Sequence, residues 1–334
     1  MFSRLFYFIF FLCIGFYASG QLKRFTFSQP KMGSPFTIIL YANDSLRAAT
    51  IADKCFSLVD SLVFIFSDYI DSSELNRLCA RAGKMSSPVT VSDPLFDILM
   101  LSKMAWEKSK GTFDITVGPL TRLWRKARKE AVFPSNKMVT EKLALTGFKK
   151  IKLYPATKSA QLRQAGMQLD LGGIAQGYIA QKVIDYLKTN HITQALVDVS
   201  GDIVAIGTPP GTKGWTVGIN FPESTKEILK RSLLVKNRAI TTSGDVYQHF
   251  DHNGKRYSHI IHPKTGYGIT SQRNVTVIAA DGTTADWLTK ACSLLPIKEA
   301  KKLATTLKAE LLVTEIKNGK LVFYRTAGFA HYWK

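Results

Sequence analysis

Residues 169–187, LDLGGIAQGYIAQKVIDYL, hold the first group that could do chemistry. Asp170 stands at the expected end of a strand, Gly172 and Gly173 form a turn, and a helical pattern follows. A helix N-terminus offers unpaired N–H groups and a partial positive charge, so it can bind a phosphate or another anion. The same pattern also fits a tight strand-to-helix turn packed against a core. Taken alone, the stretch leaves both readings open.

Residues 256–261, RYSHII, place a histidine in an expected strand. Alternation along a strand puts Tyr257, His259 and Ile261 on one face. An unperturbed histidine titrates near pH ~6.5, so it can accept a proton at neutral pH. A histidine between apolar neighbours is also typical of a half-buried structural residue, and both interpretations remain.

Two further stretches carry carboxylates. Residues 111–124, GTFDITVGPLTRLW, contain Phe113 and Asp114 in a segment broken by glycine and proline, where Asp114 could simply cap a turn or helix. Residues 284–294 form an expected helix in which Asp286 and Lys290 are four positions apart. Such a pair on a helix surface stabilises it by only about 0.2–0.5 kcal/mol.

The elements that position these residues follow from hydrophobic periodicity. We expect two strands joined by a turn within 24–42, a helix over 45–66, and a helix from 93 with Ser92 as its N-cap. The second half contains six strand candidates, interrupted by two helices that begin after Gly173 and near Thr284. Because helices and strands mix without strict alternation, the sequence favours an α+β or layered α/β fold.

The N-terminus has the pattern of a signal peptide over residues 1–20. A short basic start precedes an apolar run from Leu5 to Tyr17, and Ala18 and Gly20 have the small side chains of a cleavage site. The run is short for a bilayer span, so an uncleaved anchor is the alternative. We expect an exported protein, mature over 21–334, in the periplasm or at the outer face of the membrane.

Cysteine spacing and charge narrow the classes of partner. Outside residues 1–20, three cysteines remain: Cys55, Cys79 and Cys292. Their number is odd and no pair has metal-ligand spacing, so we expect buried free thiols, at most one disulfide bridge and no zinc site. The net charge is +20, but the basic residues are spread along the chain. With export, this argues against nucleic acid. A solvated charged surface, association with an anionic membrane surface, and steering of a phosphate-bearing substrate remain.

Taken in order, seven motifs resemble those of the ApbE family of flavin transferases: MGSPFTI, GTFDITVGPLTRLW, LDLGGIAQGY, VDVSGDIVAIG, AITTSGDVYQHF, YSHIIHPKTG and ADWLTKA. The resemblance extends from Phe25 to Val322 and implies a single α+β domain, with layered helices and a mixed or antiparallel sheet. It implies binding of FAD and Mg²⁺, and transfer of FMN to a Thr or Ser hydroxyl of an exported or membrane redox protein, with release of AMP. The alternatives are hydrolysis of FAD to FMN and AMP, or FAD binding without catalysis.

The resemblance also implies roles for individual residues. His259 matches the base that activates the acceptor hydroxyl, and the carbonyl of Gly173 and the carboxylate of Asp286 match metal ligands. The positions that match contacts to the flavin cofactor are Met32, Phe113, Asp114, Asp170, Gln176 and Ile260.

Four positions depart from the family pattern. Lys290 replaces the threonine that usually follows the metal aspartate by four residues, and an ammonium group cannot ligate a cation. Gln176 replaces a Lys or Glu, Ser200 replaces a Gly, and His262 replaces an Asp. Three outcomes are open: a rearranged metal site, a Lys290 charge that faces the phosphates, or a binder with little catalysis. We favour the second, which predicts weak Mg²⁺ dependence.

Overall fold

The computed structural model describes residues 21–84, 87–219, 229–244, 249–271, 273–317 and 320–334. The expected signal peptide lies outside these ranges. Among the described helices, none combines the length and apolar character that crossing a bilayer requires.

An antiparallel sheet of eight strands forms the centre of the fold, in the order β1-β2-β6-β7-β10-β13-β14-β15. Every neighbouring pair is antiparallel, so the α+β expectation is confirmed in its antiparallel form. The strands are β1 (Lys23–Lys31), β2 (Ser34–Ala42), β6 (Ala195–Val199), β7 (Asp202–Ile206), β10 (Arg238–Ser243), β13 (Arg273–Ala279), β14 (Glu310–Lys317) and β15 (Lys320–Arg325).

The helices begin where the sequence supplies caps. Asp44 accepts hydrogen bonds from the N–H groups of Leu46 and Arg47 at the start of α1, and Ser92 caps α3 as predicted. The predicted helix over 45–66 is confirmed at both ends. The α-helices are α1 (Ser45–Phe66), α2 (Glu74–Ala80), α3 (Asp93–Lys108), α4 (Gly118–Glu130), α5 (Asn136–Leu143), α6 (Ala175–Thr189), α7 (Gly282–Leu294) and α8 (Ile297–Thr306).

Both faces of the central strands are buried, in the two-residue period that strands impose. Val197 and Val204 face the main core beneath α6 and α7. Their neighbours Leu196 and Ala205 face a second core on the opposite side. That second core is covered by β8 (Trp215–Val217), β9 (Leu233–Val235) and the 3₁₀ helix η4 (Ala327–Tyr332).

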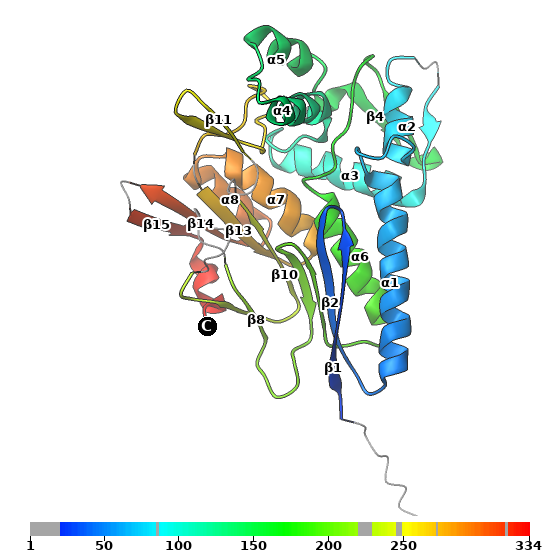
Figure 1. The fold of residues 1–334 in the computed structure, drawn as a ribbon, viewed down its shortest axis with the longest axis vertical. Coiled ribbons are helices and arrows are strands. Elements are labelled where there is room, and N and C mark those ends of the chain that lie inside the picture. Colours follow the sequence, from blue (N-terminus) through cyan, green and yellow to red (C-terminus); the bar gives the residue numbers. More distant parts are fainter. Residues whose placement is uncertain (1–20, 85–86, 220–228, 245–248, 272, 318–319) are drawn as a thin grey trace, which may run out of the picture.

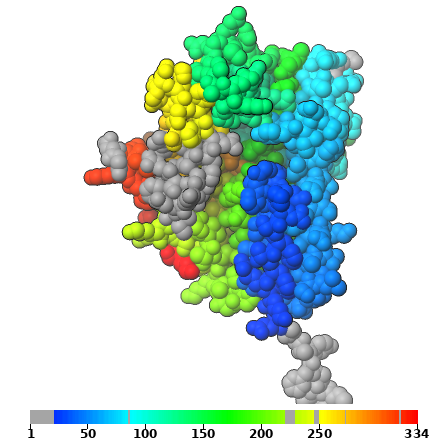
Figure 2. All heavy atoms as spheres, in the orientation of Figure 1, coloured from blue at the N-terminus to red at the C-terminus, as the bar shows by residue number. Residues whose placement is uncertain are grey.

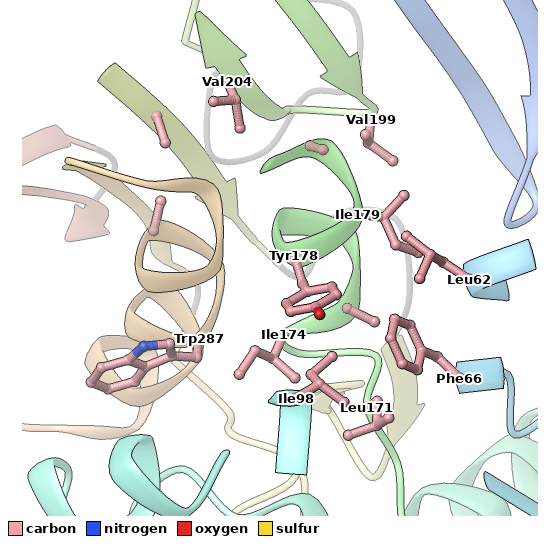
Figure 3. Packing of buried hydrophobic residues seen from close by; sticks show 14 of the residues in the cluster. Leu62, Phe66, Ile98, Leu171, Ile174, Tyr178, Ile179, Val199, Val204 and Trp287 are labelled. Atoms are coloured by element: carbon pink, nitrogen blue, oxygen red, sulfur yellow. The ribbon is translucent and has the colours of Figure 1, made fainter. Parts of the chain in front are cut away.

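Helices α6 and α7 lie side by side on the sheet, with α1 packed outside α6 (Figure 1). Figure 3 shows Tyr178 of α6 facing Phe66 of α1, and their ring centroids are 5.5 Å apart. The predicted thiols fit this packing, because Cys55, Cys79 and Cys292 are buried and free.

Smaller elements gather beyond one end of α7 (Figure 1). They include the hairpin β11 (His249–His252) and β12 (Lys255–Ser258), which packs its aromatic rings around Trp124 of α4. The remaining elements are a three-stranded sheet of β3 (Val89–Thr90), β4 (Ile151–Tyr154) and β5 (Ser159–Leu162), and the 3₁₀ helices η1 (Ile115–Val117), η2 (Phe148–Lys150) and η3 (Pro155–Thr157).

The contact between α6 and α7 depends on two glycines. A Cβ on Gly177 would lie 2.1 Å from the carbonyl oxygen of Gly282, and one on Gly282 would lie 2.4 Å from the carbonyl oxygen of Gly177. Both distances are far below contact between a carbon and an oxygen atom. The helix backbones therefore approach more closely than any other residue type permits.

We predict that Gly177→Ala lowers the free energy of unfolding by about 1–3 kcal/mol, because the methyl group must push the two helices apart. Helix propensity alone predicts the opposite sign, a gain of about 1 kcal/mol. Chemical denaturation of the variant, beside the exposed Lys188→Ala on the same helix, measures the difference. A Gly177→Ala protein more stable than the wild type would show that the close approach is not a constraint.

Candidate active site

A cavity of about 700 Å³ opens where the hairpin β1–β2, the end of α1, α4, the start of α6 and α7 converge. In Figure 2 the surface is recessed between the tip of the hairpin and the segment around α4. Nine of the residues selected from the sequence line this cavity: Met32, Phe113, Asp114, Asp170, Gly173, Gln176, His259, Ile260 and Lys290. The tenth, Asp286, is fully buried and does not line it.

Met32 reaches the cavity from the two-residue turn of the β1–β2 hairpin. Both turn residues, Met32 and Gly33, have positive φ, at 53° and 76°. Mirror-image turns of this kind match the twist of a hairpin, although a side chain such as that of Met32 adopts the conformation reluctantly. The turn thus holds one side chain at the rim of the cavity.

Asp170 fixes the glycine turn before α6 through its carboxylate and its backbone N–H. Asp170 Oδ1 accepts a hydrogen bond of 2.8 Å from the N–H of Gly172, and the N–H of Asp170 donates to the carbonyl of Ile115 at 2.8 Å. A Cβ on Gly173 would lie 3.1 Å from Cγ of Lys290 and 3.2 Å from the ring of Phe113. The turn therefore is tightly packed, and the same residues also line the cavity.

Asp114 acts as a cap, which confirms the structural reading of this residue. Its Oδ1 accepts hydrogen bonds from the N–H and hydroxyl of Thr116, and its Oδ2 accepts one of 3.1 Å from the N–H of Phe148. Burial raises the pKa of the Asp114 carboxyl, against the lowering effect of these hydrogen bonds. The carboxylate joins the loop before α4 to η2.

The predicted strand around His259 is wrong at its end. Strand β12 stops at Ser258, and the alternation of Tyr257, His259 and Ile261 does not hold. Tyr257 packs in the aromatic cluster around Trp124 and His259 lines the cavity, whereas Ile261 belongs to that cluster and also lines the cavity. The reason is local, because the hydroxyl of Ser258 captures the N–H of Ile260 and breaks the extended ladder.

His262 replaces the aspartate that the family usually has, and it keeps a capping role. Its Nδ1 accepts a hydrogen bond of 3.1 Å from the N–H of Lys264, and its carbonyl accepts one of 2.9 Å from the N–H of Gly266. Burial, then the nearby Lys264, lowers the pKa of His262, which favours the neutral acceptor form. The turn after His259 is thus preserved with a different side chain.

Asp286 and Lys290 form a buried pair rather than the weak surface pair that their spacing predicts. Lys290 Nζ lies 2.9 Å from Oδ1 of Asp286 and donates a hydrogen bond of 2.7 Å to the hydroxyl of Ser243 on β10. The other oxygen of Asp286 accepts a hydrogen bond of 2.9 Å from the N–H of Gly177 in the first turn of α6. Asp286 is 0% exposed and the Lys290 side chain is 19% exposed.

A second carboxylate completes this cluster. Asp202 of β7 is buried, and its burial, followed by the charge of Asp286, raises its pKa to about 7. For Lys290, burial alone would lower the pKa, but the carboxylates of Asp286 and Asp202 outweigh it and raise the pKa. Both acidic residues therefore favour the charged form of the Lys290 ammonium group.

These residues do not fit the magnesium site that the resemblance implies. Mg²⁺ needs carboxylate and carbonyl oxygens that are free to bind it. Oδ2 of Asp286 accepts the N–H of Gly177. Oδ1 accepts no hydrogen bond among the described residues, but it lies 2.9 Å from the Lys290 ammonium group, whose positive charge opposes a metal ion there. Within the described ranges, no three His, Cys, Asp or Glu side chains gather as a set that could hold a metal ion.

Sequence reasoning missed several polar residues at the cavity, among them Asp68, Tyr69, Arg125 and Arg128. Tyr69 is 74% exposed, and its ring stacks 4.2 Å from the guanidinium of Arg125, which pairs with Asp68. Arg128 also lines the cavity and has no ion-pair or hydrogen-bond partner among the residues that the structure describes. The spacing of Arg122, Arg125 and Arg128 at every third position is the signal that could have placed them on one helix face.

Known proteins are similar to this chain in sequence and in fold. The model of the ApbE family matches residues 32–313. A FAD:protein FMN transferase from Klebsiella pneumoniae is 32% identical over 82% of this chain and 86% of its own length, and one from Treponema pallidum is 34% identical over 73% and 70%.

Solved structures agree with these relatives. The flavin transferase ApbE from Vibrio cholerae superposes with a TM-score of 0.84 at 25% identity, covering 93% of this chain and all of its own. The apo form of the flavinyl transferase ApbE from Pseudomonas stutzeri gives a TM-score of 0.82 at 26% identity. With its family model matched across most of its length and its fold shared, this chain belongs to the ApbE family.

Proposed function

We propose that this protein is a FAD:protein FMN transferase that moves FMN from FAD to a Thr or Ser hydroxyl of another protein and releases AMP. The observation that carries the proposal is the single cavity in which Asp170, His259 and Lys290 meet, although they come from distant parts of the chain. The activity named for the relatives supports the same reaction.

In this reaction the acceptor oxygen bonds to the flavin-side phosphorus of FAD, and the bond from that phosphorus to the bridging oxygen breaks. The electron pair of the broken bond leaves with AMP. His259 takes the proton of the acceptor hydroxyl as general base. Phosphoryl transfer depends mainly on positioning and on neutralising charge, and Arg128 and Lys290 supply positive charge at the cavity.

The acceptor is a redox protein of an exported or membrane electron-transfer complex, and the reaction takes place in the periplasm or at the outer face of the membrane. The signal-peptide pattern of residues 1–20 supports this location. The net charge of +20 supports contact with an anionic membrane surface as well as attraction of the phosphate-bearing donor.

We predict that the protein, incubated with FAD and a threonine-bearing acceptor, adds one FMN to the acceptor. Intact mass spectrometry measures the gain, and an acceptor with that threonine changed to valine is the control. Free FMN and AMP without labelling would instead identify a FAD pyrophosphatase. Unchanged bound FAD would identify a binding protein, and either result would overturn the proposal.

Loss of the proposed base should separate binding from chemistry. We expect His259→Ala to bind FAD within a few fold of the wild type and to transfer FMN at least ~10²-fold more slowly. Flavin fluorescence titration gives the affinity and intact mass gives the rate. His331→Ala, an exposed histidine on the opposite face, should leave both unchanged. Transfer by His259→Ala at the wild-type rate would make His259 a structural residue.

Asp114→Asn tests whether the cap or a ligand contact dominates at this position. In the wild type, both carboxylate oxygens of Asp114 accept hydrogen bonds from neighbouring N–H and hydroxyl groups. The asparagine replaces one of these oxygens with an NH₂ group, so that two donors face each other. We expect the free energy of unfolding to fall by about 1–3 kcal/mol.

Thermal and chemical denaturation measure this loss, and Asp97→Asn, an exposed carboxylate on α3, provides the matched control with a change within ~0.5 kcal/mol. If Asp114→Asn were as stable as the wild type but bound FAD at least tenfold more weakly, Asp114 would act as a direct ligand contact.

A further inference from the structure

We propose that the ammonium group of Lys290 is a built-in cation that takes the place of a divalent metal at the donor pyrophosphate, so that the protein transfers FMN without Mg²⁺. This inference rests on the proposed function, because it concerns the charge that the transfer reaction needs. It gives Lys290, four residues after Asp286 on α7, a direct contact with the substrate.

The position of Lys290 is fixed from three sides. Its Nζ lies 2.9 Å from Asp286 Oδ1, one helical turn earlier on α7, and 2.7 Å from the hydroxyl of Ser243 on the sheet. Its Cγ passes the Gly173 turn so closely that a Cβ there would lie 3.1 Å away. A lysine held in this way loses little further freedom when a ligand binds.

The ammonium group also has capacity to spare. It carries three N–H donors, and the described part of the chain provides hydrogen-bond or ion-pair partners for two of them, Asp286 and Ser243. The Lys290 side chain keeps 19% of its surface exposed and lines the cavity beside the Asp170–Gly173 turn. The third donor is therefore available to a phosphate oxygen in that cavity.

A divalent cation cannot easily share this position. Mg²⁺ binds carboxylate oxygens at ~2.1 Å, and the Asp286 oxygen that lines up with Lys290 is already 2.9 Å from the ammonium group. The other oxygen accepts the N–H of Gly177. A metal at Asp286 would have to displace Lys290 or lie within a few ångströms of another positive charge in a partly buried site.

The charges of the cluster support the replacement. The carboxylate of Asp286 favours the charged form of Lys290 and fixes its position, and Asp202 is close enough to affect the electrostatics of both. The cation is thus retained without a metal, and the carboxylates position it. In the step itself Lys290 forms and breaks no covalent bond: it stabilises negative charge on the pyrophosphate oxygens while the acceptor oxygen displaces AMP.

The first experiment uses the wild-type protein, so it does not depend on any variant that fails to fold. Mn²⁺ serves as a spectroscopic probe for Mg²⁺, and electron paramagnetic resonance counts the bound metal in the presence and absence of FAD. FMN transfer to the acceptor is measured after treatment with EDTA and again after Mg²⁺ is added. We expect no Mn²⁺ bound at micromolar concentrations and EDTA-treated transfer within twofold of the Mg²⁺ value.

Variants then test the charge itself. Lys290→Met should slow transfer by ~10²-fold or more and weaken FAD binding, whereas Lys290→Arg, which keeps a cation, should recover part of both. Lys290→Thr should bind Mn²⁺ at least tenfold more tightly than the wild type and become Mg²⁺-dependent. Lys298→Met, an exposed lysine on α8, is the matched control. The double variant Asp286→Asn/Lys290→Met removes both charges and keeps the test informative if Lys290→Met alone does not fold.

The outcomes separate this inference from the proposed function. Tight Mn²⁺ binding by the wild type, with transfer abolished by EDTA and restored by Mg²⁺, would overturn the role of Lys290 and leave the transferase intact. Transfer and FAD affinity unchanged in Lys290→Met would also overturn it. If no condition yields transfer, the proposed function is wrong. The Mn²⁺ binding of the wild type and the FAD affinity of Lys290→Met then still show whether Lys290 takes the place of the metal.

Discussion

The rest of this structure depends on the contacts of one buried carboxylate, that of Asp286. It is 0% exposed, and it connects three elements. α7 carries it, the N–H of Gly177 in the first turn of α6 donates to it, and its ion pair with Lys290 extends to β10 through Ser243. A buried carboxylate without partners would be costly. Its partners therefore hold both helices and the sheet in one arrangement, and one of them, Lys290, lines the cavity.

Close backbone contact makes that arrangement possible. The N–H of Gly177 reaches Asp286 only because α6 and α7 touch through Gly177 and Gly282, where any Cβ would collide with a carbonyl oxygen. Gly173 is packed in a similar way, because side-chain atoms of Phe113 and Lys290 lie close to the position that a Cβ would take. Glycines in these motifs serve packing first, and the packing brings cationic and carboxylate groups to one cavity wall.

Much of this could be predicted from the sequence, because local signals are strong where caps and periodicity agree. The helix over 45–66 follows from its apolar spacing, the start of the helix at 93 follows from Ser92, and the glycine turn follows from its composition. The end of β12 could not be predicted, because it depends on the Ser258 hydroxyl and on pairing with a loop at Gly268 and Ile269. The burial of Asp286 and Lys290 also could not be predicted, because two residues four apart on a helix have the same spacing whether the helix face is exposed or packed against a sheet.

The departures from the family pattern differ in their physical consequences. His262 keeps the function of the residue it replaces, because a neutral imidazole nitrogen accepts the same turn N–H that a carboxylate would. Ser200 takes a position with φ of 53°, a left-handed conformation that suits glycine better, so that exchange costs local strain and adds no charge. Lys290 adds a positive charge where the family usually has a neutral threonine, and it does so beside a carboxylate with no exposure to water. A change of that kind is tolerated only where the surroundings already favour a cation. In the proposal above, the pair of Asp286 and Lys290 therefore keeps a cation at this site, and the cation is an ammonium group in place of a metal ion.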